Sequence, residues 1–255
     1  MAGRTFVIGD IHGDLAALHK VVARMPQPDA EDTMVFLGDY IDRGLDSAGV
    51  VDFLMNVLPT HTAARLVMLR GNHEDAWIKV MDAGWKDFVV PIGNGCFQTM
   101  QSFLGEPVEP LGASPTLAQF ERMGAADFFP PSVVRWLHEL PFWYEDEHAI
   151  YVHAGLPLAP TDGFVHPRDA TGKQQIALLW IRDQRFFRDY RGKTVVVGHT
   201  GTSKLPPELS DYTPDDRSDL WYGPAVIGID TGAGMRGFLT GLELPGGVIY
   251  ESRDL

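Results

Sequence analysis

Two carboxylates and a guanidinium stand close together just after an apolar run near the start of the chain. Met34–Leu37 is followed by Gly38, and then by Asp39, Asp42 and Arg43. Carboxylates gathered in one cleft repel one another unless positive charge lies between them, and a bound metal ion lets several acidic groups share a site. The stretch therefore indicates a metal site, a pairing of the carboxylates with the arginine, or both.

Four further apolar runs end in the same way, with a residue that can bind a metal just beyond the run. The donors so placed, with the first, are Asp10, His12, Asp39, Asn72, His153 and His199. Oxygen and imidazole donors without a thiolate suit manganese, iron, zinc or cobalt better than a structural zinc site made from cysteines. The set is too large for one tetrahedral ion, so it predicts two divalent ions that share a carboxylate. Manganese is the first expectation, with iron or zinc as alternatives.

A pair of metal ions about 3.5–4 Å apart is suited to phosphoryl transfer, because it lowers the pKa of a bridging water and polarises the phosphoryl oxygens. Arg43 and Arg182 could bind the phosphate, since a guanidinium matches two phosphate oxygens. His73 could give the leaving oxygen its proton, with Asp42 holding the imidazole in its charged form. The alternatives are a surface ion pair between Asp42 and Arg43, a His73 that only orients water, and an Arg182 that pairs with a carboxylate.

Strands and helices must bring these residues together. The apolar runs predict strands over Thr5–Ile8, Met34–Leu37, Leu66–Leu69, Ala149–Val152, Thr194–Val197 and Ala225–Ile229. Between and after the first three, the spacing of apolar residues predicts helices over 15–25, over 47–58 with Pro59 as its end, and over about 74–81. Such alternation favours a largely parallel sheet with right-handed crossovers and a ligand crevice at the C-terminal strand ends.

The pattern loosens over residues 82–131, which we interpret as an insertion lying over the site. Short helices are expected near 98–104 and 117–123, and a more regular helix over 132–140. The later predicted elements are a strand over 142–144, a helix over 174–179, an acidic connection over 204–223 and a hairpin of 237–244 with 248–252. Fewer helices separate these strands, which favours antiparallel pairing. Because the candidate ligands run from residue 10 to residue 199, one domain is predicted for residues 1–255.

Several blocks of the sequence resemble the phosphoprotein phosphatase family of calcineurin-like metallophosphoesterases. The three signature-like blocks are Gly9-Asp10-Ile11-His12-Gly13, Gly38-Asp39-Tyr40-Ile41-Asp42-Arg43-Gly44 and Gly71-Asn72-His73-Glu74. His153-Ala154-Gly155 and Gly198-His199 resemble the two later metal histidines of the family. Trp180-Ile181-Arg182 and Asp230-Thr231-Gly232-Ala233 resemble blocks of bacterial and phage members. The resemblance gives Asp230 no catalytic role.

The resemblance implies a role for each matching residue. One metal ion would be held by Asp10, His12 and Asp39, and the second by Asp39, Asn72, His153 and His199. His73 with Asp42 would form the proton-donor pair, and Arg43 and Arg182 would hold the phosphate. The implied fold is an α/β sandwich of two mixed sheets flanked by helices. The implied reaction is hydrolysis of phosphoserine or phosphothreonine in proteins, with phosphotyrosine also open, by a hydroxide that bridges the metals and attacks phosphorus directly.

Two other functions compete with this interpretation. A symmetrical dinucleoside tetraphosphate hydrolase, or another small-molecule phosphoesterase of the superfamily, would use similar ligands. Asp42-Arg43-Gly44 and Glu74 favour the protein phosphatase branch, because those hydrolases usually lack the first pattern and end the third block in Asp. A non-catalytic module that binds phosphate groups would be expected to have lost some ligands, and none is missing.

Composition narrows the choice of partner and compartment. The formal net charge of −13 argues against a nucleic acid polymer as the ligand, since no basic stripe is present. No apolar run reaches the length of a membrane span, and no charged-then-apolar leader precedes the first strand, so no membrane association is expected. The single cysteine, Cys96, excludes an intramolecular disulfide and favours the reducing cytoplasm. The predicted partner is therefore a phosphorylated protein or a small phosphate ester.

Overall fold

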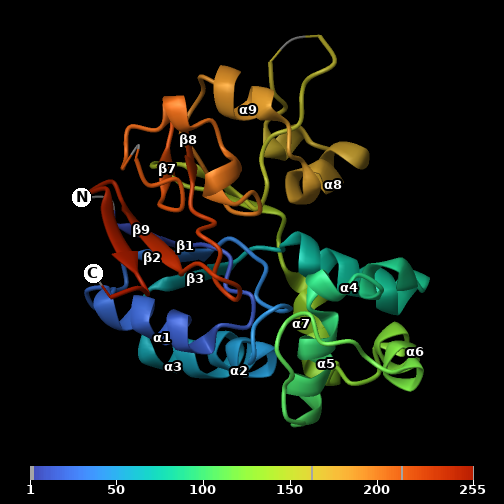
Figure 1. Ribbon diagram of the computed structural model, residues 1–255. Helices are drawn as coiled ribbons and strands as arrows, with labels where there is room; N and C mark the ends of the chain where they lie inside the picture. Colours follow the sequence, from blue (N-terminus) through green and yellow to red (C-terminus); the bar gives the residue numbers. More distant parts are fainter. Residues whose placement is uncertain (1–2, 162, 214, 255) are drawn as a thin grey trace.

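Two five-stranded sheets lie face to face in the computed structural model, which describes residues 3–161, 163–213 and 215–254 (Figure 1). The first sheet has the order β10-β9-β1-β2-β3 and the second the order β4-β5-β6-β8-β7. The strands are β1 (Thr5–Ile8), β2 (Thr33–Phe36), β3 (Arg65–Met68), β4 (Trp143–Glu145), β5 (Ile150–Val152), β6 (Val195–Val197), β7 (Trp221–Tyr222), β8 (Val226–Gly228), β9 (Thr240–Leu244) and β10 (Val248–Glu251).

Alternate residues of the strands face different apolar layers, as the period of two in a strand requires. Val7 and Val35 face the second sheet and pack with Val196 and Ile227. Their neighbours, such as Phe6, face the helices on the outside of the first sheet. Ile150 and Val195 lie on the outer face of the second sheet. They belong to a third apolar cluster that also contains the helical residues Leu178 and Phe186. The layers therefore run helix, sheet, sheet, helix.

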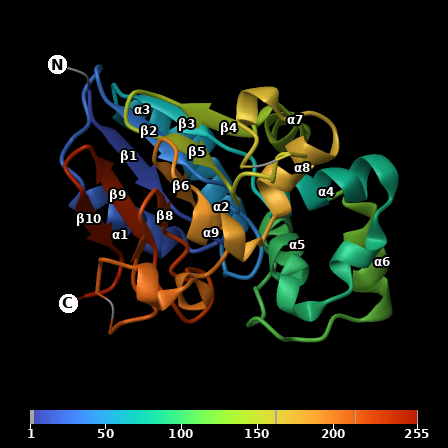
Figure 2. The same cartoon turned by 90° about the horizontal axis from the view of Figure 1, so that it is seen from above.

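Helices cover both outer faces and form a separate group at one side. The α-helices are α1 (Leu15–Arg24), α2 (Ser47–Asp52), α3 (Leu58–His61), α4 (Asn72–Ala83), α5 (Cys96–Leu104), α6 (Leu117–Ala125), α7 (Pro131–Glu139), α8 (Lys173–Trp180) and α9 (Gln184–Asp189). The first three lie under the first sheet, α8 and α9 lie beside the second, and α4 to α7 gather at one side, as Figures 1 and 2 show. None of the helices described is long and apolar enough to cross a membrane.

The predicted fold of two mixed sheets flanked by helices is confirmed. β1, β2 and β3 pair in parallel, and so do β5, β6 and β8. Antiparallel pairing comes later in the chain, as expected, between β4 and β5, between β7 and β8, and along β1-β9-β10. The hairpin of β9 and β10 is one of these pairs.

Pro59 does not end the second predicted helix, and this expectation was wrong. Residues 53–57 form a π-helical turn in which the Leu58 N–H donates to the Phe53 carbonyl. Pro59 then falls in the first turn of α3, where a residue without an N–H is tolerated, and the helix continues to His61.

Other differences concern short elements and a helix start. The third predicted helix, α4, begins at Asn72 rather than near Glu74, with Gly71 as its N-cap. The helix α9 and the strand β7 were not predicted. β7 is two residues long and lies within the segment interpreted as an acidic connection, so its apolar pattern was too short to be recognised.

Candidate metal centre

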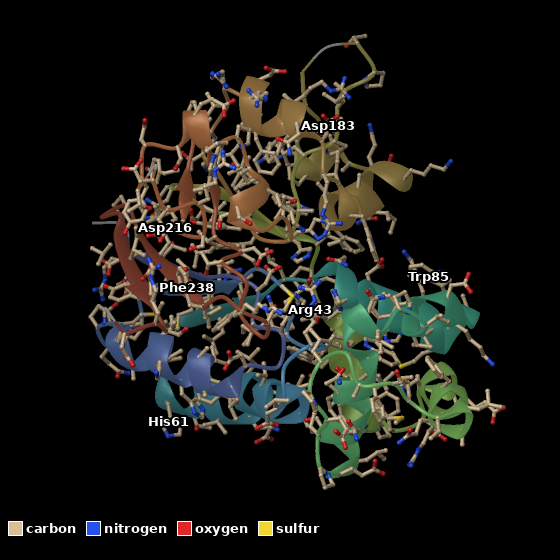
Figure 3. All side chains as sticks on the ribbon, viewed as in Figure 1. Arg43, His61, Trp85, Asp183, Asp216 and Phe238 are labelled. Carbon is tan, nitrogen blue, oxygen red and sulfur yellow. The ribbon has the colours of Figure 1, made fainter. Side chains whose placement is uncertain are left out.

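The ends of strands from both sheets deliver polar side chains into one cleft. β1 leads to Asp10 and His12, β2 to Asp39, and β3 to Asn72, all from the first sheet. The second sheet contributes His153 after β5 and His199 after β6. All six side chains are buried. The cleft lies where the two sheets meet α4, at the position of Arg43 in Figure 3.

The donor atoms of these side chains converge around Asp39. Its Oδ2 lies 3.4 Å from His12 Nε2, and its Oδ1 lies 3.4 Å from His153 Nε2. Asn72 Oδ1 lies 3.0 Å from His153 Nε2 and 2.7 Å from His199 Nδ1. The structure thus brings all six predicted ligands together, with Asp39 in the middle.

The hydrogen bonds of His153 show that the site suits a cation. Its Nδ1–H donates to the Leu37 carbonyl over 2.8 Å, which leaves a lone pair on Nε2. That lone pair faces the oxygens of Asn72 and Asp39, so three acceptors point at one another. A positive ion among them relieves this repulsion. In metal-binding histidines the other ring nitrogen typically donates a hydrogen bond to a backbone carbonyl or a carboxylate, as Nδ1 does here.

His12 has the same arrangement, with its Nδ1–H donating to the Ile41 carbonyl over 3.0 Å. Burial lowers the pKa of His12, and also lowers the pKa of His199 to about 2, with the neighbouring charges of His153 and Arg182 adding to the effect. Both imidazoles are therefore neutral near pH 7 and can offer a lone pair to a metal.

The buried polar atoms without a hydrogen-bond partner among the residues the structure describes include Asp10 Oδ1, His199 Nε2 and Arg43 Nε of this cleft. The other carboxylate oxygen of Asp10 accepts from the His199 backbone N–H over 2.9 Å. Burial raises the pKa of Asp10, and the charges of Asp230 and Asp39 raise it further. An unpaired buried carboxylate oxygen is costly. The residues present therefore fit a site for two metal ions.

Backbone strain is concentrated at the same place. Five of the seven non-glycine residues described with a positive φ are candidate site residues: His12, Asp39, Asp42, Arg43 and His199. This conformation costs on the order of 1–3 kcal/mol for a non-glycine residue and clusters at functional sites. A close approach adds a further constraint, since a Cβ on Gly198 would lie 2.0 Å from Asp10 Oδ1.

Asp42 is buried and bound to a histidine rather than paired with Arg43 at the surface. Its Oδ2 lies 2.6 Å from His73 Nδ1, which donates to it. Thr99 Oγ1–H donates to Oδ1 over 2.6 Å, and Trp77 Nε1–H donates to both carboxylate oxygens, at 2.9 and 3.1 Å. The carboxylate therefore has donors on every side and is held in one orientation.

His73 and Asp42 have the geometry of a proton-donor pair. Burial by itself lowers the pKa of His73, but the charges of Asp39 and Asp42 and the hydrogen bond to Asp42 outweigh it and raise the pKa. The imidazole is therefore more readily protonated than an ordinary histidine. His73 Nε2 also lies 3.9 Å from Asp39 Oδ2, beside the predicted metal ligands.

The two predicted phosphate-binding arginines both line the cleft. Arg43 Nη1 lies 2.6 Å from His12 Nε2, and its Nη2 lies 3.2 Å from His73 Nε2. The guanidinium of Arg43 thus places its positive charge among the candidate metal ligands. It must turn away from His12 to bind a phosphate. Arg182 donates to the His199 carbonyl over 3.3 Å.

Glu74 and Trp77 also belong to the site, although the sequence analysis gave neither a structural role there. Glu74 lies in the first turn of α4. It accepts from the Gly71 N–H, and it also accepts from the N–H groups of Asp39 and Tyr40. It therefore fixes the loop that carries Asp39 against α4. Burial and the charge of Asp39 raise the pKa of Glu74 to about 8.

Thr99 and Asp230 were not predicted as part of the site. Thr99 comes from the segment interpreted as an insertion, and nothing in the local sequence marks it. Asp230 follows β8 just as the predicted ligands follow their strands, and this position was the available signal. Its carboxylate is buried, accepts from the Gly232 N–H over 3.1 Å and lines the cleft.

Comparisons with known proteins agree with this arrangement. A model of the family described as calcineurin-like phosphoesterase matches residues 3–227. The serine/threonine-protein phosphatase SIT4 of Candida albicans is 35% identical over 91 residues, which are 34% of this chain and 29% of that protein. A catalytic subunit of protein phosphatase 2A from Dictyostelium discoideum is 36% identical over 75 residues, which are 28% of this chain and 22% of that protein. The chain aligns to less than a third of the length of these two relatives.

Other similar proteins match over nearly the whole chain. Bis(5'-nucleosyl)-tetraphosphatase PrpE, the asymmetrical enzyme, of Bacillus mycoides is 24% identical over 260 residues, covering 94% of this chain and 89% of that protein. The solved structure of a presumed diadenosine tetraphosphatase has a TM-score of 0.56 and 23% identity, covering 98% of this chain and 93% of that one. A metallophosphoesterase from Sphaerobacter thermophilus has a TM-score of 0.52 and 17% identity, covering 100% of this chain and 89% of that one. The two structures show the shared fold. With the family match over most of its length, the chain belongs to the calcineurin-like phosphoesterases, a family of hydrolases with a dinuclear divalent metal centre.

Proposed function

We propose that the chain hydrolyses phosphate monoesters by direct attack of water on phosphorus, with phosphoserine and phosphothreonine in proteins as the first candidate substrates. One observation carries the proposal. Five other buried candidate metal ligands surround Asp39, and a His73–Asp42 pair lies beside them. The arrangement supplies a site for metal ions and a proton donor within one cleft.

Two divalent ions bound there would lower the pKa of water and neutralise charge on the phosphoryl oxygens. The protein's own groups have separate tasks. Arg182, and Arg43 after its guanidinium has turned from His12, bind the equatorial phosphate oxygens. His73 gives a proton to the leaving alkoxide, and Asp42 keeps the imidazole oriented and charged. No covalent phosphoenzyme is needed in this scheme.

The protein phosphatase relatives support a phosphoprotein substrate. Glu74 supports it as well, because the competing hydrolases usually have Asp at this place. Its carboxylate accepts from the N–H groups of Asp39 and Gly71 and so connects the second and third sequence blocks. Metal removal followed by add-back of manganese, iron or zinc, with a phosphoserine peptide as substrate, tests the activity. Release of phosphate that depends on added metal is expected. Peptide binding without phosphate release would point to a binding module instead.

The route of attack has its own test. Single-turnover analysis of the protein during hydrolysis distinguishes direct attack from a phosphoenzyme, because water supplies one oxygen to the phosphate by either route. Direct attack leaves the protein unphosphorylated throughout the turnover. A phosphorylated side chain that forms and decays during turnover would overturn the proposal.

Hydrolysis of dinucleoside tetraphosphates is a second candidate function. It is favoured by the relative PrpE, which is named for that activity and aligns with 94% of this chain. Rates on diadenosine tetraphosphate and on the phosphopeptide, measured under the same metal conditions, would separate the two candidates. The products also report the bond cleaved: two ADP from symmetrical cleavage, AMP and ATP from asymmetrical cleavage.

A further inference from the structure

The Arg43 side chain occupies two positions that other groups need in a working site. Its Nη1 lies 2.6 Å from His12 Nε2, the ring nitrogen left free to bind a metal ion. Its Nη2 lies 3.2 Å from His73 Nε2. In the proposed reaction, the leaving oxygen of the substrate takes its proton from that same nitrogen of His73. Arg43 must therefore give up both contacts before the site can hydrolyse a phosphate ester.

The backbone of Arg43 is tightly enclosed, so this change must come from rotation of its side chain. Arg43 has a φ of 70°, and a Cβ on Gly95 would lie 2.0 Å from the Arg43 backbone nitrogen. The guanidinium is less completely held, because its buried Nε has no hydrogen-bond partner among the described residues. An unpaired buried donor is costly. A new acceptor would therefore stabilise the rotated side chain.

The carboxylates that share this cleft differ in how fully they are engaged. Asp10 and Asp39 are candidate metal ligands, and bound cations would match their charge. Asp42 already has donors on every side. Asp230 differs from all three: its Oδ1 accepts from a backbone N–H over 3.1 Å, and its Oδ2 has no hydrogen bond or ion pair with another residue that the structure describes. Asp230 is thus the carboxylate left to receive a cation.

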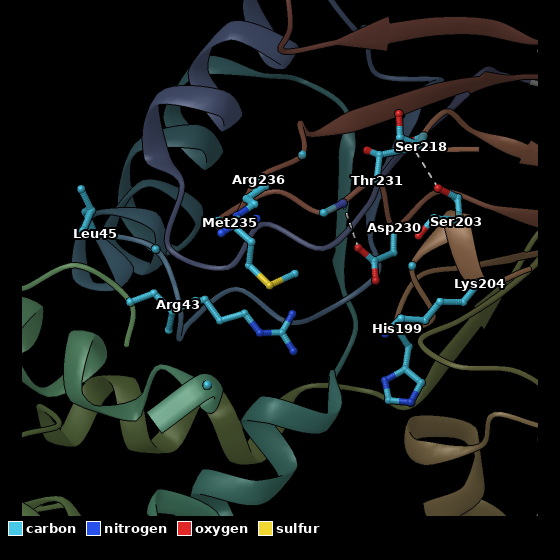
Figure 4. A pocket seen from close by; sticks show the side chains of 18 of the residues that line it. Arg43, Leu45, His199, Ser203, Lys204, Ser218, Asp230, Thr231, Met235 and Arg236 are labelled. Carbon is cyan, nitrogen blue, oxygen red and sulfur yellow. Dashed lines mark hydrogen bonds between the residues drawn. The ribbon is translucent and has the colours of Figure 1, made fainter. Parts of the chain in front are cut away.

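Asp230 is firmly placed and faces the same space as Arg43. Figure 4 shows the Arg43 guanidinium and the Asp230 carboxylate directed into one part of the cleft. The Asp230 carbonyl accepts from the Thr202 N–H over 3.0 Å. The loop that follows packs on the first ligand loop, where a Cβ on Gly234 would lie 2.3 Å from the His12 carbonyl oxygen. Burial raises the pKa of Asp230, and the charge of Arg43 acts against this rise.

We propose that Asp230 is a positioning residue, which accepts the Arg43 guanidinium once that side chain has left His12 and His73. The inference rests on the proposed function, because it concerns how the phosphate is bound there. A guanidinium has several N–H donors in one plane, so a pair with one carboxylate leaves others free for phosphate oxygens. Asp230 itself touches neither the phosphate nor a metal ion in this arrangement.

Other cations of the cleft are poorer partners for Asp230. Arg182, Lys204 and Arg236 also line the cleft, but all three are exposed. An ion pair in solvent contributes little. Arg43 is half-buried and Asp230 is buried, so a pair between them is screened less by water and salt.

A double-mutant cycle on phosphate binding tests the pair. Calorimetry measures the Kd of inorganic phosphate for the manganese-loaded protein in the wild type, Asp230→Asn, Arg43→Ala and the variant with both changes. We expect Asp230→Asn to raise this Kd about tenfold, because Arg43 is then no longer aligned for charge-assisted hydrogen bonds to the phosphate. In the Arg43→Ala background, Asp230→Asn should have no further effect, since residues that act through one another are not additive.

Metal content gives a second readout. Elemental analysis should find as much manganese in Asp230→Asn as in the wild type, because Asp230 is not proposed as a ligand. The matched control is Asp219→Asn, which alters a buried carboxylate that accepts from Arg253 outside the cleft. It should leave phosphate binding unchanged.

Additive effects of Asp230→Asn and Arg43→Ala on the Kd would overturn the proposal, and so would a loss of manganese from Asp230→Asn. Absence of p-nitrophenyl phosphate hydrolysis by the manganese-loaded wild type would instead contradict the proposed function. The binding cycle needs no turnover, so the two failures can be told apart.

Discussion

Thr99 Oγ1 donates a 2.6 Å hydrogen bond to Asp42 Oδ1 from a helix 57 residues further along the chain. The same hydroxyl accepts from the Asp42 backbone N–H over 2.8 Å. One side chain thus fixes both the backbone and the carboxylate of the residue that orients His73. The segment 82–131 therefore reaches the centre of the site.

Thr99→Val should impair proton donation more than any other step. Valine matches the shape of threonine but cannot donate to Asp42, so the carboxylate is less firmly held and His73 less well oriented. We expect kcat toward a phosphoserine peptide to fall about tenfold, and kcat toward p-nitrophenyl phosphate, whose leaving group needs little protonation, to fall much less. Thr99→Ser keeps the hydroxyl and should therefore retain the wild-type kcat on both substrates. Thr5→Val, which removes a buried hydroxyl that donates to Asp146, is the control. Equal losses on both substrates would indicate general damage to the fold.

His73→Asn should retain bound metal and lose about 10²–10⁴ in rate toward substrates with poor leaving groups. The asparagine keeps a polar group near Asp42 but cannot deliver a proton. Metal content by elemental analysis and kcat toward phosphoserine peptide give the two readouts. His138→Asn changes an exposed histidine paired with Asp82 and serves as the control. Full activity of His73→Asn would remove the assigned role.

Asp39→Asn should lose metal occupancy. Asp39 is the carboxylate that the buried donor cluster of His12 and His73 shares with that of His153 and His199. An amide lacks the charge that two cations require. Elemental analysis after dialysis against a defined metal buffer measures the effect. Asp14→Asn, which alters a carboxylate that caps α1 and which asparagine can replace as a cap, should keep the metal. A normal metal content in Asp39→Asn would show that the ions bind elsewhere.

Metal removal should lower the midpoint of thermal unfolding. The donors come from β1, β2 and β3 of one sheet and from β5 and β6 of the other, so a bound ion connects the two layers. A ligand at 100 times its dissociation constant stabilises the folded state by about 2.7 kcal/mol. Calorimetric scans in chelator and in excess manganese should therefore differ, and the difference should vanish in Asp39→Asn. Identical midpoints for the wild type in the two buffers would contradict this expectation.

Asp32 provides a prediction on stability far from the cleft. Burial raises its pKa, but hydrogen bonds from Arg4 and from the Asp29 N–H outweigh burial and hold the pKa below its usual value. A carboxylate with a lowered pKa stabilises the fold above its unfolded-state pKa, and the effect is lost as the pH falls through the folded-state value. Asp32→Asn should therefore reduce the free energy of unfolding by about 1–3 kcal/mol at pH 7.

The pH dependence of that difference checks its origin. The gap between wild type and Asp32→Asn in urea unfolding should stay constant from about pH 6 to 8 and narrow below about pH 4. Asp52→Asn, which changes an exposed carboxylate, is the matched control. A gap that does not change with pH would mean that packing, and not the ionised carboxylate, sets the effect.

Much of the fold and of the donor set could be predicted because both follow from short-range patterns. An apolar run followed within a few residues by a polar side chain marks a strand end, and parallel strands place such ends at one edge of a sheet. Asp10, Asp39, Asn72, His153 and His199 were predicted in this way. The meeting of two sheets at the cleft came from the family resemblance, and the structure confirms that fold.

What the sequence missed depends on contacts between distant segments. Thr99 stands in an ordinary amphipathic helix, and only the packing of α5 against α2 brings it to Asp42. The orientation of Arg43 toward His12 depends on side-chain torsions that no spacing encodes. The helical conformation continues past Pro59 because a π-helical turn precedes it and a new helix begins there. Proline's missing N–H is tolerated in the first turn of that helix. The roles of the site residues and the extent of the domain stay predictions.

The left-handed backbone at Asp39, Asp42 and Arg43 has a consequence for directed evolution of this chain. Glycine at such positions relieves the steric cost that other residues bear there. A library screened for heat resistance alone in a chelating buffer, where bound metal adds no stability, would therefore enrich substitutions that remove these side chains, and its best-surviving members would be inactive. Screening for turnover at each round is needed, because thermal stability favours glycine at these positions whereas the proposed activity requires the aspartate and arginine side chains.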